Sequence, residues 1–215
     1  MSRKRVYGGV RPAVKRRKPT IARDLRLLKA RVNRQRNVGF LDTQIVDEVD
    51  TTGLVSCLNL IAEGTDDNER LGNKINMIGL EYCISIVPET SNTTWGHCSV
   101  YIVYDKQPNG ALATPANIVE SLTSPTFPKW GDKDRFTILR KFQCESARFA
   151  NADANSSNQW YGYIKLNKKT NYDAATATIG SINSGALLCL FVGSLTAATN
   201  STKDARCNFR LTFDQ

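Results

Sequence analysis

Apolar and polar residues alternate with the period of a β-strand along most of the chain. Near the C-terminus, Phe209, Leu211 and Phe213 face one side while polar residues face the other, which is typical of a strand with one buried face. Residues 75–87 alternate at first and then become apolar on both faces, and residues 186–192 are apolar throughout, as in strands covered on both faces. The pattern predicts eight strands: residues 41–49, 54–61, 75–87, 98–105, 136–144, 160–166, 186–192 and 207–213.

Clusters of Gly, Pro, Asn, Asp and Ser separate these segments and predict turns. The predicted turns are residues 50–53, 64–73, 108–110, 131–134, 151–158 and 167–184. One helix is predicted over residues 114–122, because Thr114 fits the N-cap and Pro115 fits the first helical position. Eight strands with long, unequal connections and no internal repeat favour an all-β fold, an eight-stranded single jelly roll (a Greek-key sandwich) with one short helix between strands.

The first thirty-six residues have a different composition from the rest. Fourteen Lys or Arg side chains stand there against one acid, Asp24, so this segment carries about +13 by count, whereas the whole chain carries +9. Residues 37–215 hold fifteen basic and nineteen acidic side chains, a balance of −4. This asymmetry predicts two parts: a basic N-terminal arm, residues 1–36, and a folded shell domain, residues 37–215.

The arm itself divides in two. Residues 1–20 are interrupted by Gly and Pro and offer almost nothing to bury, so we expect them to be disordered in the free protein. Apolar residues recur at helical spacing over residues 21–36 and predict a short amphipathic helix that Thr20 caps. They are Ile21, Leu25, Leu28 and Val32. We expect this stripe to dock on the body or on a partner subunit rather than on a membrane, because the helix is short.

The charge of the arm predicts binding to nucleic acid without sequence preference, since Lys and Arg contact phosphates and release counterions. A solvated charge run without a ligand is less favoured, because so much like charge repels itself unless phosphates neutralise it. The candidate binding residues are Arg3, Lys4, Arg5, Arg11, Lys15, Arg16, Arg17, Lys18, Arg23, Arg26, Lys29, Arg31, Arg34 and Arg36. The block Lys15, Arg16, Arg17 and Lys18 also fits a nuclear-import signal for host import factors, although such blocks often occur by chance.

No segment fits a membrane span or a signal peptide. The longest apolar run, residues 186–192, is far shorter than the ~20 residues that a spanning helix needs. The N-terminus lacks the apolar core of a signal peptide. We therefore expect a soluble protein that is not secreted by that route and has no membrane partner.

The sequence argues against an enzyme. His97 is the single histidine, and the metal-dependent jelly-roll enzymes called cupins need several around their metal. His97 and Cys98 are neighbours on a predicted strand, so their side chains point to opposite faces and would not meet. Walker, dinucleotide-binding and zinc-finger motifs are absent. We expect no catalytic residues, no cofactor and no metal.

Two groups of residues leave alternatives open. Asp66, Asp67 and Glu69 could hold Ca²⁺ between subunits, since hard cations take several oxygen ligands, but a solvated acidic loop is favoured. The cysteines are scattered without a C-x-x-C pair and mostly lie in apolar runs, which favours buried free thiols, although a bridge between neighbouring strands stays open. They are Cys57, Cys83, Cys98, Cys144, Cys189 and Cys207.

Three segments behind the basic arm carry a family resemblance. Residues 72–80 read Gly-Asn-Lys-Ile-Asn-Met-Ile-Gly-Leu, residues 100–110 contain the turn Tyr-Asp-Lys-Gln-Pro-Asn-Gly, and residues 134–140 read Asp-Arg-Phe-Thr-Ile-Leu-Arg. In this order, with a short helix before the third, they resemble capsid proteins of small circular single-stranded DNA viruses, the circovirus-like and geminivirus-like coat proteins. The plan is also similar to that of the satellite tobacco necrosis virus coat protein. Some geminivirus coat proteins have a Cys/His cluster proposed to bind zinc, and its absence here argues against a close tie to them.

The resemblance implies a single jelly roll whose subunits form a small icosahedral T=1 shell of about sixty copies, with the arm inside. It favours single-stranded DNA over RNA as cargo, in a virion assembled in the host nucleus. The alternative is a non-viral β-sandwich module that binds nucleic acid through a basic tail. Apolar residues separate the two: a shell subunit should present Phe127, Trp130 and Trp160 to its neighbours, whereas a monomer would bury them.

Overall fold

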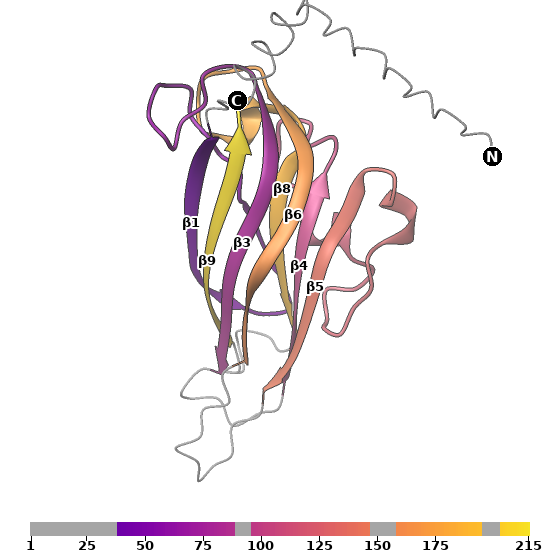
Figure 1. Ribbon diagram of the computed structural model, residues 1–215. Helices are drawn as coiled ribbons and strands as arrows, with labels where there is room; N and C mark the ends of the chain where they lie inside the picture. The colour runs from indigo at the N-terminus through magenta and orange to yellow at the C-terminus, as the bar shows by residue number, and fades with distance from the viewer. Residues whose placement is uncertain (1–37, 89–95, 147–157, 195–202) are drawn as a thin grey trace, which may run out of the picture. The chain divides into compact units, whose positions relative to one another are not determined.

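A computed structural model describes residues 38–88, 96–146, 158–194 and 203–215, which form a sandwich of two antiparallel sheets (Figure 1). The five-stranded sheet has the order β1-β9-β3-β6-β7, and the four-stranded sheet has the order β2-β8-β4-β5. The strands are β1 (Val38–Val49), β2 (Leu54–Cys57), β3 (Lys74–Pro88), β4 (Gly96–Asp105), β5 (Phe136–Ser146), β6 (Asn158–Tyr172), β7 (Ile182–Ser184), β8 (Ala186–Gly193) and β9 (Lys203–Asp214).

The strand pairs nest inside one another. β1 pairs with β9, β2 with β8, β3 with β6, and β4 with β5, all antiparallel. A chain folded as one long hairpin and then rolled up gives this order, with successive pairs alternating between the two sheets. The predicted jelly roll is confirmed.

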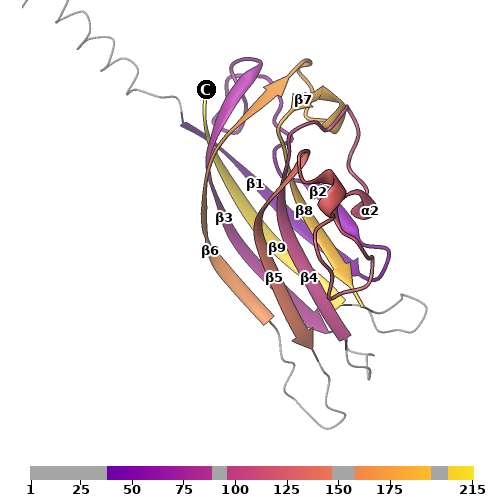
Figure 2. The same ribbon diagram turned by 90° about the vertical axis from the view of Figure 1, so that its right-hand side faces the viewer.

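The two sheets are covered differently. β8 is buried along its whole length, because its sheet packs on the five-stranded sheet on one face and lies under the connection between β4 and β5 on the other. Figure 2 shows that connection, with helix α2 (Pro115–Ile118), on the four-stranded sheet. The outer face of the five-stranded sheet is open to solvent at β6, where Tyr161 and Tyr163 are exposed and alternate with more buried positions. None of the helices among the described residues is long and apolar enough to cross a membrane.

All eight predicted strands are present, but β2 is shorter than expected and ends at Cys57. The side chain of Asn59 is the reason. Its Oδ1 accepts a hydrogen bond from Leu187 N (2.8 Å), and its Nδ2 donates to Gly185 O (3.0 Å) and to Thr170 Oγ1 (2.9 Å). The side-chain oxygen of this fully buried amide accepts the hydrogen bond that a backbone carbonyl would accept in a continued strand, so the strand ends here. The amide also links the end of β2 to both sheets.

The predicted turn over residues 167–184 is confirmed in its middle, residues 173–181, but is wrong at both ends. β6 continues to Tyr172, and the short strand β7 pairs with its end. Two side chains in this polar segment are buried and hydrogen-bonded. Thr170 donates to Gly185 O (2.8 Å), and Tyr172 donates to Asn59 O (2.8 Å). Both bonds join residues that are distant in sequence or separated by a turn, so the local pattern gave no signal.

Helix α2 begins where it was predicted but is shorter. Thr114 is its N-cap, and the Thr114 hydroxyl and backbone N–H both donate to Asn117 Oδ1 (2.7 and 3.0 Å). The helix ends at Ile118, because the next residues pair with residues 127–129 through backbone bonds, Glu120 N to Phe127 O (2.9 Å) and Lys129 N to Ile118 O (2.8 Å). The second half of the predicted helix is therefore one side of a short hairpin.

A buried arginine organises the connection between β2 and β3. Arg70 has no exposed surface, and its guanidinium donates to Ile61 O (3.2 Å), Gly72 O (2.6 Å) and Ala174 O. The same group lies 4.3 Å from the centre of the Tyr172 ring. Because the planar fork satisfies carbonyls from three segments at once, it fixes this connection against the end of β6.

We predict that Arg70→Met lowers the free energy of unfolding by about 3 kcal/mol, because the carbonyls it serves lose their donors inside the protein. Urea denaturation of the folded body measures the change. Arg70→Lys should recover little, since an ammonium cannot make the forked contacts. Lys74→Met at an exposed position is the matched control, and equal stability of the Arg70 and Lys74 variants would contradict the assignment.

Candidate functional site

The predicted nucleic-acid-binding residues all lie outside the described residues. The same holds for the import signal at Lys15, Arg16, Arg17 and Lys18, and for the predicted helix over residues 21–36. These assignments stay predictions. The described body offers a different candidate site, a surface on the connection between β4 and β5.

The two most specific segments of the family resemblance meet at the base of this connection. Arg135 donates from Nε and Nη2 to the two carboxylate oxygens of Asp105, at 2.9 and 2.8 Å. Asp105 is fully buried, and its hydrogen bonds to Arg135 raise the pKa of the guanidinium. Lys106 adds a backbone bond to Arg135 O (3.0 Å) and an ammonium bond to Asp134 O (2.7 Å). The two ends of a thirty-residue excursion are thus held together by a bidentate ion pair.

Side chains of the four-stranded sheet hold the middle of the excursion. Tyr101 on β4 and Lys141 on β5 both donate to Thr126 O, at 2.6 and 2.8 Å. Ser99 Oγ lies 2.9 Å from Ser124 Oγ. Burial raises the pKa of the Tyr101 phenol and lowers that of the Lys141 ammonium. These contacts make the excursion a fixed layer on the sheet.

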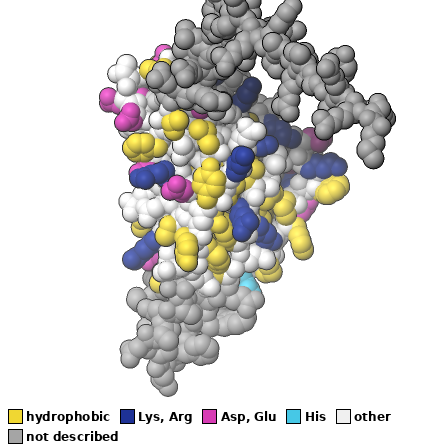
Figure 3. All heavy atoms as spheres, viewed as in Figure 1, with side chains coloured by type: hydrophobic (Ala, Val, Ile, Leu, Met, Phe, Trp, Pro, Cys, Tyr) yellow, Lys and Arg dark blue, Asp and Glu magenta, His cyan; other side chains and the backbone are white. Residues whose placement is uncertain are grey.

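This layer presents two aromatic side chains to solvent. Phe127 is 77% exposed and Trp130 is 74% exposed. They border a mostly apolar hollow of about 530 Å³ whose lining includes Ile118, Phe136 and Ile138. We call Phe127, Trp130 and this hollow the aromatic patch. Figure 3 shows hydrophobic and basic side chains together at this edge of the protein.

The backbone around the aromatic patch is ordered by local bonds. Glu120 Oε1 accepts from Trp130 N at 2.9 Å, and the Lys133 ammonium lies 4.3 Å from the centre of the Trp130 ring. A large apolar area on a fixed loop is typical of a protein interaction surface. The sequence supplied the candidates Phe127 and Trp130, but the hollow between them required the fold.

Trp160 does not belong to this surface. It is half-buried on β6 and packs on Phe142 of β5, with ring centres 5.6 Å apart. Phe142 also makes an edge-on contact with Tyr82, at 5.1 Å. The expectation that Trp160 faces a neighbouring subunit stays a prediction, since within the subunit its ring packs where β5 and β6 approach each other.

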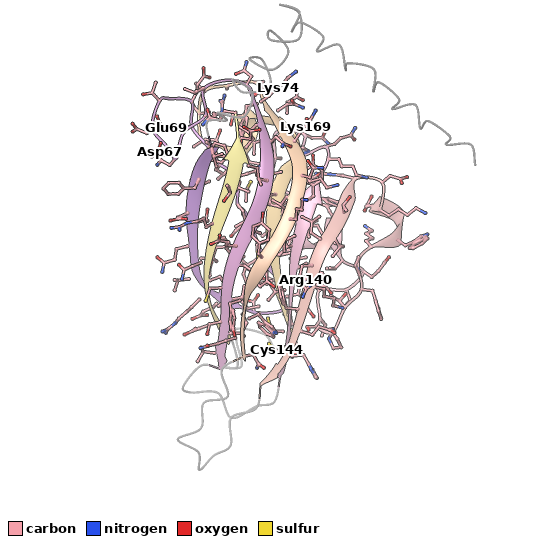
Figure 4. All side chains as sticks on the ribbon, in the orientation of Figure 1. Asp67, Glu69, Lys74, Arg140, Cys144 and Lys169 are labelled. Carbon is pink, nitrogen blue, oxygen red and sulfur yellow. The ribbon has the colours of Figure 1, made fainter. Side chains whose placement is uncertain are left out.

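The other candidate groups form no metal site in the described part of the chain. On β4, Cys98 is buried and His97 is half-buried. Glu69 Oε2 accepts from Asp66 N (3.0 Å), while Asp67 contributes its backbone carbonyl to Phe40 N (2.9 Å). Figure 4 shows Asp67 and Glu69 on the connection after β2. Among described residues, no group of three or more His, Cys, Asp or Glu side chains is placed to hold a metal ion.

All six cysteines are free thiols. Cys98, Cys144, Cys189 and Cys207 are buried and Cys57 is half-buried, whereas Cys83 is exposed on the five-stranded sheet, contrary to the expectation of burial. Burial raises the pKa of Cys57 to about 11 and that of Cys207 to about 12, and it also raises the pKa of Cys189.

The family model of the Geminivirus coat protein/nuclear export factor BR1 family matches residues 2–215. The chain belongs to this family. Membership extends over the whole sequence although the zinc-type Cys/His cluster is absent, so that departure does not exclude the chain from the family. A coat-protein family indicates a structural rather than an enzymatic role for the body.

Comparison with solved structures finds viral capsid proteins at low similarity. The infectious bursal disease virus VP2 subviral particle aligns with a TM-score of 0.29 and 10% identity over 81% of this chain and 32% of that chain. The 60-mer BFDV capsid protein aligns with a TM-score of 0.30 and 9% identity over 82% of this chain and 91% of that chain. This chain therefore spans about a third of the length of VP2. No curated protein matches the sequence.

We predict that Arg135→Ala lowers the free energy of unfolding by about 3 to 5 kcal/mol, because it leaves the Asp105 carboxylate buried without its partner. Thermal and urea denaturation measure the loss. Arg210→Ala is the matched control, since Arg210 makes the same two-point contact with Asp42 (2.7 and 2.8 Å) on the exposed sheet face. That exposed pair should matter little, so equal losses in the two variants would contradict the importance of burial.

We predict that one thiol per folded, unassembled subunit reacts rapidly with iodoacetamide at pH 8, and that six react after unfolding. Thiolate is the reactive form, and burial raises the pKa of Cys57, Cys189 and Cys207 well above pH 8, so these thiols stay protonated. Cys98 and Cys144 are buried away from the reagent. Mass spectrometry counts the modified sites. Cys83→Ser should abolish the fast reaction, and fast labelling of Cys189 or Cys207 in the folded protein would contradict their burial.

Proposed function

We propose that the protein is a viral capsid subunit that self-assembles into a small icosahedral shell of about sixty copies and packages a single-stranded genome through its basic arm. The observation that carries the proposal is the coat-protein family match over residues 2–215, which includes both the arm and the body. The jelly-roll order of the strands and the exposed aromatic patch support a shell-forming role.

The charge distribution supports the packaging step. The arm carries about +13 and the body −4 by count. In a shell of about sixty copies the arms would supply roughly 780 positive charges, enough to neutralise much of a kilobase-scale strand. Phosphate binding of this kind releases counterions and does not depend on the base sequence. Every part of a genome can therefore be bound by the same arm.

The cargo and the site of assembly belong to the same proposal. Single-stranded DNA is favoured over RNA, because the chain belongs to a family of geminivirus coat proteins. The virion is the expected location of the protein. The basic block Lys15, Arg16, Arg17 and Lys18 would bring the free subunit to the host nucleus through import factors.

We predict that full-length protein forms small uniform particles with a nucleic-acid-like A260/A280 ratio, and that a variant lacking residues 1–36 gives empty particles or none. Negative-stain electron microscopy and absorbance measure both properties. A second variant keeps the arm but changes its fourteen Lys and Arg residues to Gln, so that length and charge are separated. We expect it to lose nucleic acid as the deletion does, because phosphate binding depends on the charge.

Small monodisperse species from both full-length and truncated protein, over a range of salt and nucleic-acid concentrations, would contradict the capsid proposal. If nucleic-acid binding were then confined to the full-length chain, a nucleic-acid-binding module with a basic tail would be the better description. Packaged RNA in particles purified from an infected host would contradict the preference for DNA while leaving the capsid role intact.

A further inference from the structure

The body has its own charge division, separate from that of the arm. Residues 38–69 contain eight acidic side chains and no Lys or Arg. Residues 106–141, which form most of the β4–β5 excursion and half of β5, contain six Lys or Arg side chains against three acids. The acidic stretch includes all of β1, and the basic stretch includes the aromatic patch.

These two stretches lie at opposite edges of the sandwich. β1 is an outer strand of the five-stranded sheet, and β5 is an outer strand of the four-stranded sheet on the other side, next to β6. Figure 1 shows β1 and β5 at opposite edges of the body, and Figure 4 places Arg140 on β5. The acidic and basic side chains at these two edges are too far apart to form ion pairs within one subunit. They can form ion pairs between two subunits.

The end of β1 presents an acidic and apolar surface that no described strand pairs with. β1 pairs with β9 on one side only, and within the described residues the one backbone bond on its outer edge is Phe40 N to Asp67 O. Val46 is 64% exposed and is followed by the exposed Asp47 and Glu48. Neither carboxylate forms an ion pair with another described residue. We call Val46, Asp47 and Glu48 the acidic edge; an open strand edge can pair with another chain, and its charges restrict which partner can approach.

The aromatic patch has the matching chemistry. Its hollow of about 530 Å³ is mostly apolar and can take an aliphatic side chain, while Lys133 stands beside Trp130. Lys133 and the exposed Arg140 form no salt bridge within the described part of the chain. Exposed Trp in such a setting is the residue type most often found at the centre of strong interfaces.

We propose that the aromatic patch of one subunit receives the acidic edge of a second copy of this chain edge-on. Val46 lies at the hollow, and Asp47 and Glu48, on the two faces of β1, flank it beside Lys133 and Arg140. Two different surfaces at opposite edges make a head-to-tail contact, which repeats around a ring and closes if the rotation allows. Opposite charges favour this orientation, and edge-to-edge contacts of like charge are disfavoured. The inference rests on the proposed capsid function and deepens it by naming the contact.

The test combines truncation with a charge swap in the full-length chain. Trp130→Ala should raise the protein concentration needed for assembly at least about tenfold, measured by light scattering and electron microscopy. Tyr161→Ala is the matched control, because Tyr161 is 85% exposed but lies on β6 away from both surfaces. It should assemble as the unmodified chain does. Thermal unfolding of each unassembled variant checks that the fold is intact.

The charge swap tests the pairing itself. Asp47→Lys with Glu48→Lys should block assembly, and so should Lys133→Glu with Arg140→Glu, while the chain carrying all four changes should assemble again. Failure of the four-fold variant to recover, or unchanged assembly of Trp130→Ala, would overturn this contact. Both results leave the capsid proposal standing, because that proposal fails only if the unmodified chain does not assemble.

Discussion

The antiparallel ladder between β1 and β9 is the constraint on which the rest of the body depends. It joins the first and last strands over the whole length of β1, from Val38 opposite Asp214 to Val49 opposite Lys203. Once these ends are joined, every other pair has to nest between them, and the pairs fall alternately into two sheets. Because the contacts are so distant in sequence, the body must close many long loops before they are formed, which is typical of slow-folding β-sandwiches.

Nesting also decides which surfaces are available. β4 and β5 are the innermost of the nested pairs, so no further strand pair lies between them in the sequence. The long connection that joins them lies on the outer face of the four-stranded sheet. The Asp105–Arg135 ion pair closes it at the base, and Tyr101 and Lys141 fasten its middle through Thr126 O. The result is a rigid layer that displays Phe127 and Trp130, while the five-stranded sheet keeps an open face with Tyr161 and Tyr163.

Electrostatics divides the molecule at two scales. In the proposed function the two parts have separate tasks: the strongly charged arm binds phosphate, and the weakly charged body packs against copies of itself. Inside the body, acids gather in residues 38–69 and bases gather around β5. The fold places these two stretches at opposite edges of the sandwich. The subunit therefore has one acidic edge and one basic edge. This charge pattern agrees with membership of a coat-protein family.

The sequence alone determined the fold class, the family, the charge of the arm and eight of the nine strands that the structure describes, because alternation, charge and motif order are local properties. It also predicted Phe127 and Trp130 as surface candidates. It failed where a distant partner decides the local conformation: Asn59 ends β2, and Thr170 and Tyr172 extend β6. Arg70 gave no signal because its acceptors lie in three segments. Only the tertiary structure decided that the two family motifs form one clamp and that the acidic and basic stretches face opposite ways, since strand pairing across the whole chain brings those residues to their places.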